Sequence, residues 1–163
     1  MGTGIHGGFG HTNGLQNQIK KVKPQKTEST KKERMFSSTG HVTETSIRNH
    51  AEFFLGKSVA KSEHEVNKRG YETIRRPSKH STSKAKIIVT TNTSEKRNIS
   101  QLQVSPGSKR HGNVPYVKIS TTDSGKYKII NASKSEYKTD GKENAKLIFR
   151  RTKNENHYTI LWI

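Results

Sequence analysis

The chain has 163 residues and carries 31 Lys and Arg against 13 Asp and Glu, a formal net charge of +18. Apolar residues make up 27% of it, well below the roughly 45–50% of globular domains counted with Gly. Because there is no Cys, disulfides, Cys-based zinc sites and thiol catalysis are excluded. The positive charge favours a polymeric phosphate, a nucleic acid, as the partner.

The apolar deficit is concentrated in residues 1–40, which are rich in Gly, Thr, Ser and Gln and contain the basic run Lys20–Lys26. Such a segment buries too little apolar surface to fold alone. We therefore predict a flexible Gly-rich and basic linker at 1–40 and a folded domain at 41–163. No stretch approaches the roughly 18 apolar residues of a membrane span, and no signal peptide is evident. We expect no membrane insertion by this chain.

The spacing of apolar residues between Thr43 and Gly70 predicts two short helices, separated at Gly56. Thr43 or Thr45 is suited to cap the first helix, and the two glycines stand where C-terminal caps are expected. Residues expected in the core are Ile47, Phe53, Phe54 and Leu55.

From Tyr71 onward the pattern changes to strands and turns, rich in Ile, Val, Thr and Tyr and broken by Gly, Pro and Asp. The predicted strands are Tyr71–Ile74, Lys84–Thr91, Ser100–Ser105, Tyr116–Ser120, Tyr127–Asn131, Ala145–Arg151 and Tyr158–Trp162. The Asp-Ser-Gly tip at 123–125 predicts a hairpin. The expected fold is α+β, with two short N-terminal helices packed on a twisted antiparallel sheet of about 4–6 strands.

The side chains that phosphodiester chemistry uses surround the predicted strand at 116–120. Alternation along this strand places Val117 and Ile119 in the core. The opposite face then carries Tyr116, Lys118 and Ser120, and we predict that this face is the working surface. A second segment, 77–84, also contains a histidine among lysines and hydroxyls.

Metal-free cleavage of RNA needs a base, an acid and cations to hold the charge of the phosphorane. Histidine suits both proton roles, and Lys or Arg suits the third. The predicted catalytic residues are His80, His111, Lys118 and Thr121. The predicted substrate-binding residues are Lys79, Lys84, Lys109, Arg110, Tyr116 and Ser120. Glu95 is the only acid between Pro77 and Thr122, which disfavours a two-metal nuclease there. We expect no metal site and no cofactor.

The stretches Gly4–Gly10, Arg76–Lys86 and Arg110–Thr121 together give a layout that resembles the C-terminal toxin domains of bacterial polymorphic toxins. Many of these are ribonucleases of the barnase/EndoU/colicin/RelE-like group. The resemblance covers roughly Gly40 to Arg151. It implies only a general type of active site, with His, Lys or Arg, and hydroxyl groups, and the predicted catalytic residues match this type. It implies delivery as part of a larger protein, action in the cytoplasm of a target cell, and an acidic cognate immunity protein as partner.

The leading hypothesis is a monomeric, metal-independent endoribonuclease acting on tRNA or other cellular RNA, which leaves a 2′,3′-cyclic phosphate. One alternative is a metal-dependent DNase toxin. A second is a non-catalytic basic module that binds RNA through phosphate contacts alone. A third is a ribosomal or phage structural protein whose basic tail orders on RNA.

Overall fold

The protein is described from a computed structural model, which covers residues 34–80, 83–139 and 141–150. In this part of the chain, α2 (Glu44–Asn49), the 3-10 helix η1 (Ala51–Phe53) and α3 (Val59–Asn67) come first. Strands follow, with a second 3-10 helix, η2 (Lys109–His111), between the third and fourth. The strands are β1 (Thr73–Pro77), β2 (Lys86–Thr90), β3 (Ile99–Ser105), β4 (Tyr116–Thr121), β5 (Lys126–Ile130) and β6 (Lys146–Phe149).

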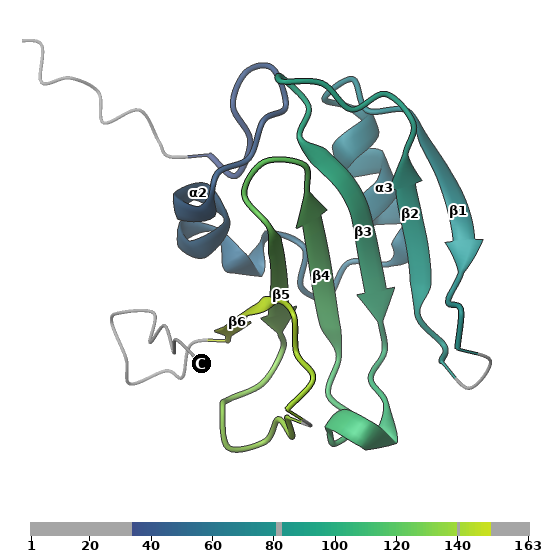
Figure 1. Ribbon diagram of the computed structural model, residues 1–163, viewed down its shortest axis with the longest axis vertical. Coiled ribbons are helices and arrows are strands. Elements are labelled where there is room, and N and C mark those ends of the chain that lie inside the picture. Colours follow the sequence, from purple (N-terminus) through teal and green to yellow (C-terminus); the bar gives the residue numbers. More distant parts are fainter. Residues whose placement is uncertain (1–33, 81–82, 140, 151–163) are drawn as a thin grey trace, which may run out of the picture. The chain divides into compact units, whose positions relative to one another are not determined.

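The strands form one six-stranded sheet in the order β1-β2-β3-β4-β5-β6 (Figure 1). The expectation of an α+β fold is confirmed, but that of a purely antiparallel sheet is wrong. Strands β1 to β5 pair antiparallel, whereas β6 runs parallel to β5. The segment 131–145 is long enough to return the chain to the start of β5, which a tight hairpin cannot do. Helical residues are also not confined to the start, because η2 interrupts the strands.

Local sequence explains where the helices begin and end. Thr43 is the N-cap of α2, and its hydroxyl accepts a hydrogen bond from the backbone of Ser46 in a capping box. Ser58 is the N-cap of α3, and its hydroxyl accepts a hydrogen bond from the Lys61 N–H. Gly56 and Gly70 have φ of 74° and 87°, values that favour glycine and end each helical segment.

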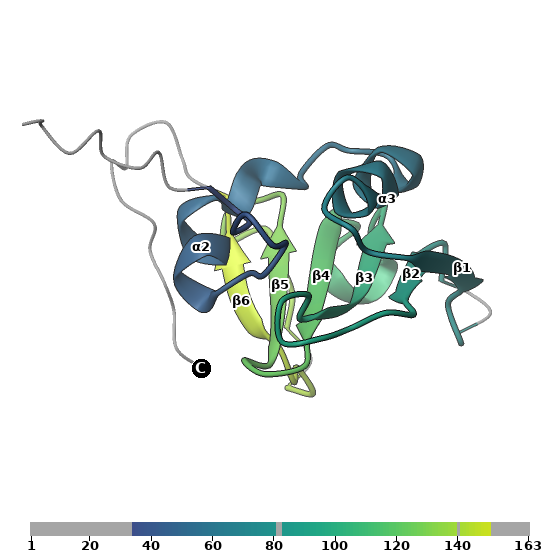
Figure 2. The same ribbon diagram turned by 90° about the horizontal axis from the view of Figure 1, so that it is seen from above.

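One face of the sheet is covered by α2, η1 and α3 (Figure 2). The main core lies between them and contains Ile47, Phe54, Val66, Ile88, Leu102, Val117, Ile119, Tyr127, Ile129 and Ile148. Phe53 and Leu55 pack against it from partly buried positions. Met35 and Phe36, which fall inside the predicted linker, are also buried in this core, and Phe36 contacts Phe53 and Phe54 edge to face.

The segment that enters the folded unit is held by two buried polar side chains. The amide of Asn98 accepts from the Val42 N–H at 2.9 Å and donates to the Val42 carbonyl at 2.7 Å. The Tyr71 hydroxyl donates to the Gly40 carbonyl at 2.7 Å and accepts from Ile99 N–H at 3.2 Å. These bonds satisfy backbone groups that would otherwise be buried without partners. The predicted linker up to 33 and the predicted strand Tyr158–Trp162 lie outside the described residues.

Candidate functional site

The face of the sheet opposite the helices carries polar side chains, as the alternation along β4 predicts. Val117 and Ile119 are buried under the helices, while Tyr116, Lys118 and Ser120 are partly exposed on the other side. The register places Lys118 between Gln103 of β3 and Lys128 of β5. We call this side the open face.

The described residues of the segment 131–145 fold over one end of the open face and bury part of it. A second apolar cluster forms there from Val114, Ile130, Ala132, Tyr137, Leu147 and Phe149. Because of this cover, Lys128 is only 4% exposed although it points away from the helices. A buried ammonium group is costly unless it is paired and hydrogen-bonded.

The partners of Lys128 come from the covering segment. Its Nζ donates to Glu143 Oε1 at 2.9 Å and to the Tyr137 hydroxyl at 2.6 Å. The Tyr137 hydroxyl donates in turn to the same carboxylate oxygen at 2.5 Å. Lys128 Nζ also lies 4.2 Å from the ring centroid of Tyr116. One lysine, one carboxylate and two tyrosines thus form a closed network.

His111 is held against this network from η2. Its ring stacks on Tyr137, with ring centroids 5.0 Å apart and an interplanar angle of 10°. Its Nδ1 lies 2.8 Å from the Lys138 carbonyl, which only accepts hydrogen bonds, so Nδ1 carries a hydrogen. Nε2 points to Glu143, at 3.9 Å from Oε1. Nε2 is therefore the ring nitrogen that is left to face Glu143.

The backbone around η2 brings this loop close to the covering segment. Gly112 has φ of 79°, and a Cβ placed on it would lie 2.9 Å from the Glu136 carbonyl oxygen. Only glycine fits both the conformation and the space. This close approach is what allows the Lys138 carbonyl to reach the His111 ring.

Electrostatics fixes the protonation of the network at neutral pH. Burial alone would raise the pKa of Glu143, but hydrogen bonds from Tyr137 and Lys128 and the charge of Lys128 outweigh it, so the pKa lies below its ordinary value. Burial, followed by the effect of Glu143, raises the pKa of Tyr137. Glu143 is therefore an ionised carboxylate and Tyr137 a neutral donor.

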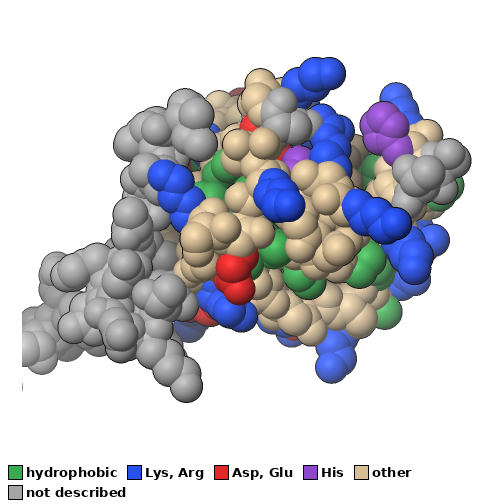
Figure 3. Space-filling view, turned by 90° about the horizontal axis from the view of Figure 1, so that it is seen from below, with side chains coloured by type: hydrophobic (Ala, Val, Ile, Leu, Met, Phe, Trp, Pro, Cys, Tyr) green, Lys and Arg blue, Asp and Glu red, His purple; other side chains and the backbone are tan. Residues whose placement is uncertain are grey.

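Lys118 extends the site onto the exposed part of the open face. Its Nζ donates to Asn144 Oδ1 at 3.1 Å. Burial, together with the charges of Lys126 and Lys128, lowers the pKa of Lys118. Such mutual repulsion is relieved when an anion binds between the cations, so the charge of this surface favours anions over cations. Looking at the lower end of the sheet, Figure 3 shows Lys and Arg side chains spread around it, with apolar surface between them.

The structure brings some of the predicted residues together and separates others. His111, Tyr116 and Lys118 meet around Lys128, and the exposed Lys109 and Arg110 belong to η2 beside them. Residues of the 77–84 segment, His80, Lys79 and Lys84, lie in the β1–β2 connection. That connection is at the same end of the sheet as η2, and the two leave from the neighbouring strands β2 and β3 (Figure 1). Lys84 lines the same pocket as Tyr116.

Thr121 lies at the other end of β4. Its hydroxyl donates to the Gly125 carbonyl at 2.8 Å and accepts from Ser124 N–H at 3.1 Å, so it shapes the β4–β5 turn. Over six strand residues this end is about 17 Å from the start of β4. Ser120 is on the open face, next to Thr121 and away from His111.

Lys128, Tyr137 and Glu143 were not among the predicted site residues. The only carboxylate between 77 and 122 is that of Glu95, which is exposed near the opposite end of the sheet. The missed residues come from β5 and from an irregular segment whose position a sequence pattern does not give. One signal was available: a lysine inside the apolar strand 127–131 is rare without a buried partner.

Within 34–80, 83–139 and 141–150, no three His, Cys, Asp or Glu side chains are grouped so as to hold a metal ion. Over the same residues, no helix has the length and apolar character needed to cross a bilayer. Comparison of the chain with protein-family models, with curated proteins and with solved structures found no match.

Proposed function

We propose that this protein is a metal-independent endoribonuclease whose active site is the His111 network on the open face. The observation that carries the proposal is the ionised Glu143 carboxylate facing Nε2 of His111, next to the cations of β4 and β5. A proton acceptor, a proton donor and a phosphate-binding surface are the groups that RNA transesterification requires.

In the proposed reaction, Glu143 accepts the proton of the 2′-OH as its oxygen forms a bond to phosphorus. The bond from phosphorus to the 5′ oxygen breaks, and protonated His111 donates the Nε2 hydrogen to that oxygen. The products are a 2′,3′-cyclic phosphate and a free 5′-OH. Because 3.9 Å leaves no room for a phosphate between the two groups, the segment 131–145, which carries Glu143, moves when RNA binds.

The other residues of the site bind the phosphate or position the Glu143 carboxylate. Lys118 and Arg110 contact the phosphate and stabilise the charge that develops on its oxygens. Lys128 is a positioning residue: its hydrogen bonds are directed to Glu143 and Tyr137, and it keeps the carboxylate ionised. In this scheme Glu143 takes the proton role first considered for His80, and Thr121 supports the fold.

The test is to incubate the purified protein with total RNA in EDTA beside His111→Ala, Glu143→Gln and Lys118→Ala. The matched control is Lys61→Ala, an exposed lysine of α3. We expect fragments ending in 2′,3′-cyclic phosphate from the wild type and the control, and a loss of at least about 100-fold in rate for His111→Ala. Intact RNA, or cleavage that survives His111→Ala, would overturn the proposal.

A non-catalytic RNA-binding module is the second candidate, and the deep burial of His111, 7% exposed, favours it. In that case the network is purely structural, and the open face binds RNA through phosphate contacts alone. Salt-dependent binding without cleavage, retained in His111→Ala, distinguishes this function from the ribonuclease. Cleavage of plasmid that depends on magnesium would instead support the DNase alternative.

We further propose that the ribonuclease is a toxin module delivered into a target cell and held inactive by an acidic immunity protein. The net charge of +18 supports an acidic partner, because opposite charges speed association and cover the RNA-binding surface. Expression inside a bacterium is expected to arrest growth, while His111→Ala does not. Growth unaffected by the wild type, produced at the same level as the variant, would contradict this role.

A further inference from the structure

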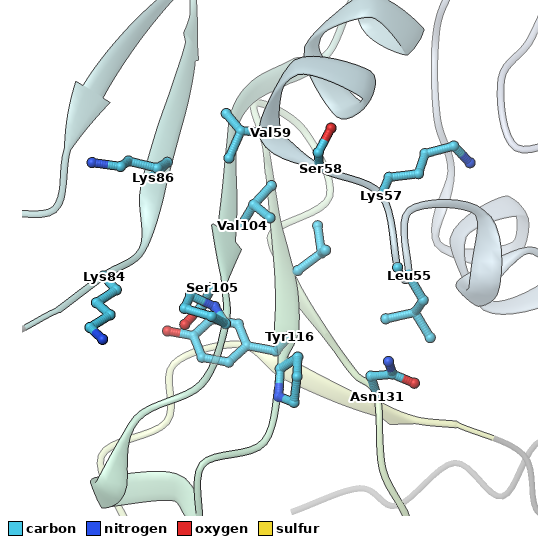
Figure 4. Close-up of a pocket in the computed structure, with 14 residues that line it drawn as sticks. Leu55, Lys57, Ser58, Val59, Lys84, Lys86, Val104, Ser105, Tyr116 and Asn131 are labelled. Carbon is cyan, nitrogen blue, oxygen red and sulfur yellow. The ribbon is translucent and has the colours of Figure 1, made fainter.

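A pocket of about 540 Å³ lies at the lower end of the sheet, on the side that faces the helices. The connection between η1 and α3 forms one wall, and the lower ends of β2, β3 and β4 form the other (Figure 4). The helices leave this end of the sheet uncovered. Its volume is within the range of about 300–1,000 Å³ that small ligands occupy.

The pocket has an apolar interior and a basic rim. Val59 and Leu55 from the helical side face Val104 and Val117 from the sheet. Three lysines complete the lining, and no Asp or Glu is among the lining residues. The lysines are Lys57, Lys84 and Lys86. In Figure 4, the ammonium groups of Lys57 and Lys86 point away from the centre, so the pocket suits an apolar group inside and negative charges outside.

Two of the rim lysines are available to a ligand. Lys84 and Lys86 are exposed and have no hydrogen-bonding or ionic partner among the described residues. Lys57 is already used, because its Nζ donates to the Phe53 carbonyl and lies 4.1 Å from the Phe53 ring centroid. Lys84 and Lys86 thus lie at the rim of an apolar pocket with no counter-ion among the described residues. This arrangement favours a ligand with a flat apolar group for the pocket and phosphates for the two ammonium groups.

The pocket adjoins the proposed active site through Tyr116. Tyr116 lines the pocket, and its ring also contacts Lys128 and lies 6.4 Å from the His111 ring, centroid to centroid. A strand of RNA bound at His111 therefore has a route around the lower end of the sheet to the pocket. Asn131 lines it as well, and among the described residues its amide hydrogens have no partner and are available to a base edge.

We infer that this pocket binds one base of the single-stranded RNA substrate, at a position that flanks the cleaved bond, while Lys84 and Lys86 contact the neighbouring phosphates. The inference rests on the proposed ribonuclease function and adds a subsite to it. It predicts a preference for unpaired RNA, because a paired base cannot enter the pocket.

The experiment uses the non-cleaving His111→Ala protein with labelled Leu and Val methyl groups. It is titrated with a single-stranded RNA hexamer, with the same hexamer in a duplex, and with octanoate. We expect the single strand to shift the methyl resonances of Leu55, Val59, Val104 and Val117, and the duplex to leave them in place. Shifts caused by octanoate and not by RNA would overturn the inference in favour of an amphipathic acid as the ligand.

Affinity for the hexamer supplies the second measurement. Lys84→Gln/Lys86→Gln in the same background is expected to weaken binding about tenfold through lost phosphate contacts. The matched control, Lys61→Gln/Lys96→Gln, removes the same charge at exposed positions outside the pocket. Equal weakening by the two pairs would show a general charge effect and overturn the subsite. Val59→Trp, which fills the pocket, is expected to weaken binding without any change of charge.

The cleavage assay on the unmodified protein distinguishes failure of the proposed subsite from failure of the proposed ribonuclease function. If the protein cleaves RNA but RNA leaves the pocket methyls unmoved, the subsite is wrong and the ribonuclease remains. If the protein leaves RNA intact, the ribonuclease proposal fails whatever the pocket binds.

Discussion

The two faces of the sheet are built from the same strands and differ in what they bury. On the helix-facing side, Ile88, Leu102, Ile119 and Ile129 are each at most 1% exposed and surrounded by apolar side chains. On the open face, Lys118 and Lys128 occupy neighbouring positions of β4 and β5. One side therefore contributes stability through apolar burial, while the other holds charged groups at a cost in stability.

The open face also contains buried charged groups. Polar groups on the open face are not simply solvated, because the segment 131–145 covers one end and withdraws Lys128 from water. Hydrogen bonds hold Lys128, Glu143 and Tyr137 against one another, and the proposed reaction requires Glu143 to leave this arrangement when RNA binds. The following substitutions test this difference between the helix-facing side and the open face, beginning with the largest expected effect.

The largest effect is expected from His111→Ala. If the proposed function holds, loss of this proton donor should lower the rate of RNA cleavage by about 10²- to 10⁴-fold. The rings that His111 contacts, Tyr137 and Tyr116, belong to the second apolar cluster. The main core should therefore stay folded, and the far-ultraviolet circular dichroism is expected to match that of the wild type. Cleavage within a factor of two of the wild type, measured on the same RNA, would show that the chemistry lies elsewhere.

Glu143→Gln should have the largest effect on stability. It leaves Lys128 buried without its counter-ion, which we expect to lower the free energy of unfolding by about 3 kcal/mol in urea denaturation. Burial lowers the pKa of Lys128, and the loss of Glu143 should lower it further. The stability of the variant should therefore rise with pH between that lowered pKa and the ordinary value of 10.5, because the unfolded chain then binds a proton that the buried lysine has released. Adding Lys128→Met to Glu143→Gln removes the unpaired charge and should restore much of the loss.

No recovery in that double variant would show that the loss comes from the packing of the covering segment rather than from the unpaired charge.

Ile119→Val tests the helix-facing side. Removing one buried methylene should lower the free energy of unfolding by about 1 kcal/mol. Because Ile119 points away from the open face, kcat and KM for RNA should stay within a factor of two of the wild type. A change in kcat larger than the change in stability explains would contradict the separation of the two faces.

Lys118→Met, one residue away on the same strand, should act in the opposite direction. It removes a half-buried charge that Lys126 and Lys128 repel, so the free energy of unfolding should rise, by less than about 1 kcal/mol because solvent screens this partly exposed group. Cleavage should fall at least about tenfold, because a phosphate contact is lost. The control is Lys61→Met on α3. A Lys118→Met variant that is both less stable and fully active would show that Lys118 neither contacts the phosphate nor costs stability.

The smallest effect is expected on the free energy of unfolding at acidic pH, where the Glu143 carboxylate becomes protonated. The folded pKa of Glu143 lies below its ordinary value of 4.5, so its contribution is fully present above that value and is lost as pH falls through the lowered pKa. The wild type should therefore lose stability below pH 4.5 more steeply than Glu143→Gln. Parallel denaturation curves for the two proteins between pH 5 and 3 would contradict this.

The elements that local patterns determine were predictable. The cap at Thr43, the glycines at 56 and 70 and the alternation along β4 each depend on residues close in sequence, and the structure confirms them. Six of the seven predicted strands overlap the observed ones, and the last, Tyr158–Trp162, lies outside the described residues. The parallel pairing of β6 was not predictable, because it depends on the path of segment 131–145.

The sequence by itself determined the α+β class, the open face of β4 and His111 as a candidate, because backbone periodicity and side-chain chemistry are local properties. Only the tertiary structure decided which groups meet His111. Lys128, Tyr137 and Glu143 join it through long-range packing of a strand and an irregular segment. Such contacts depend on the free energy of the whole folded unit, which no local pattern encodes.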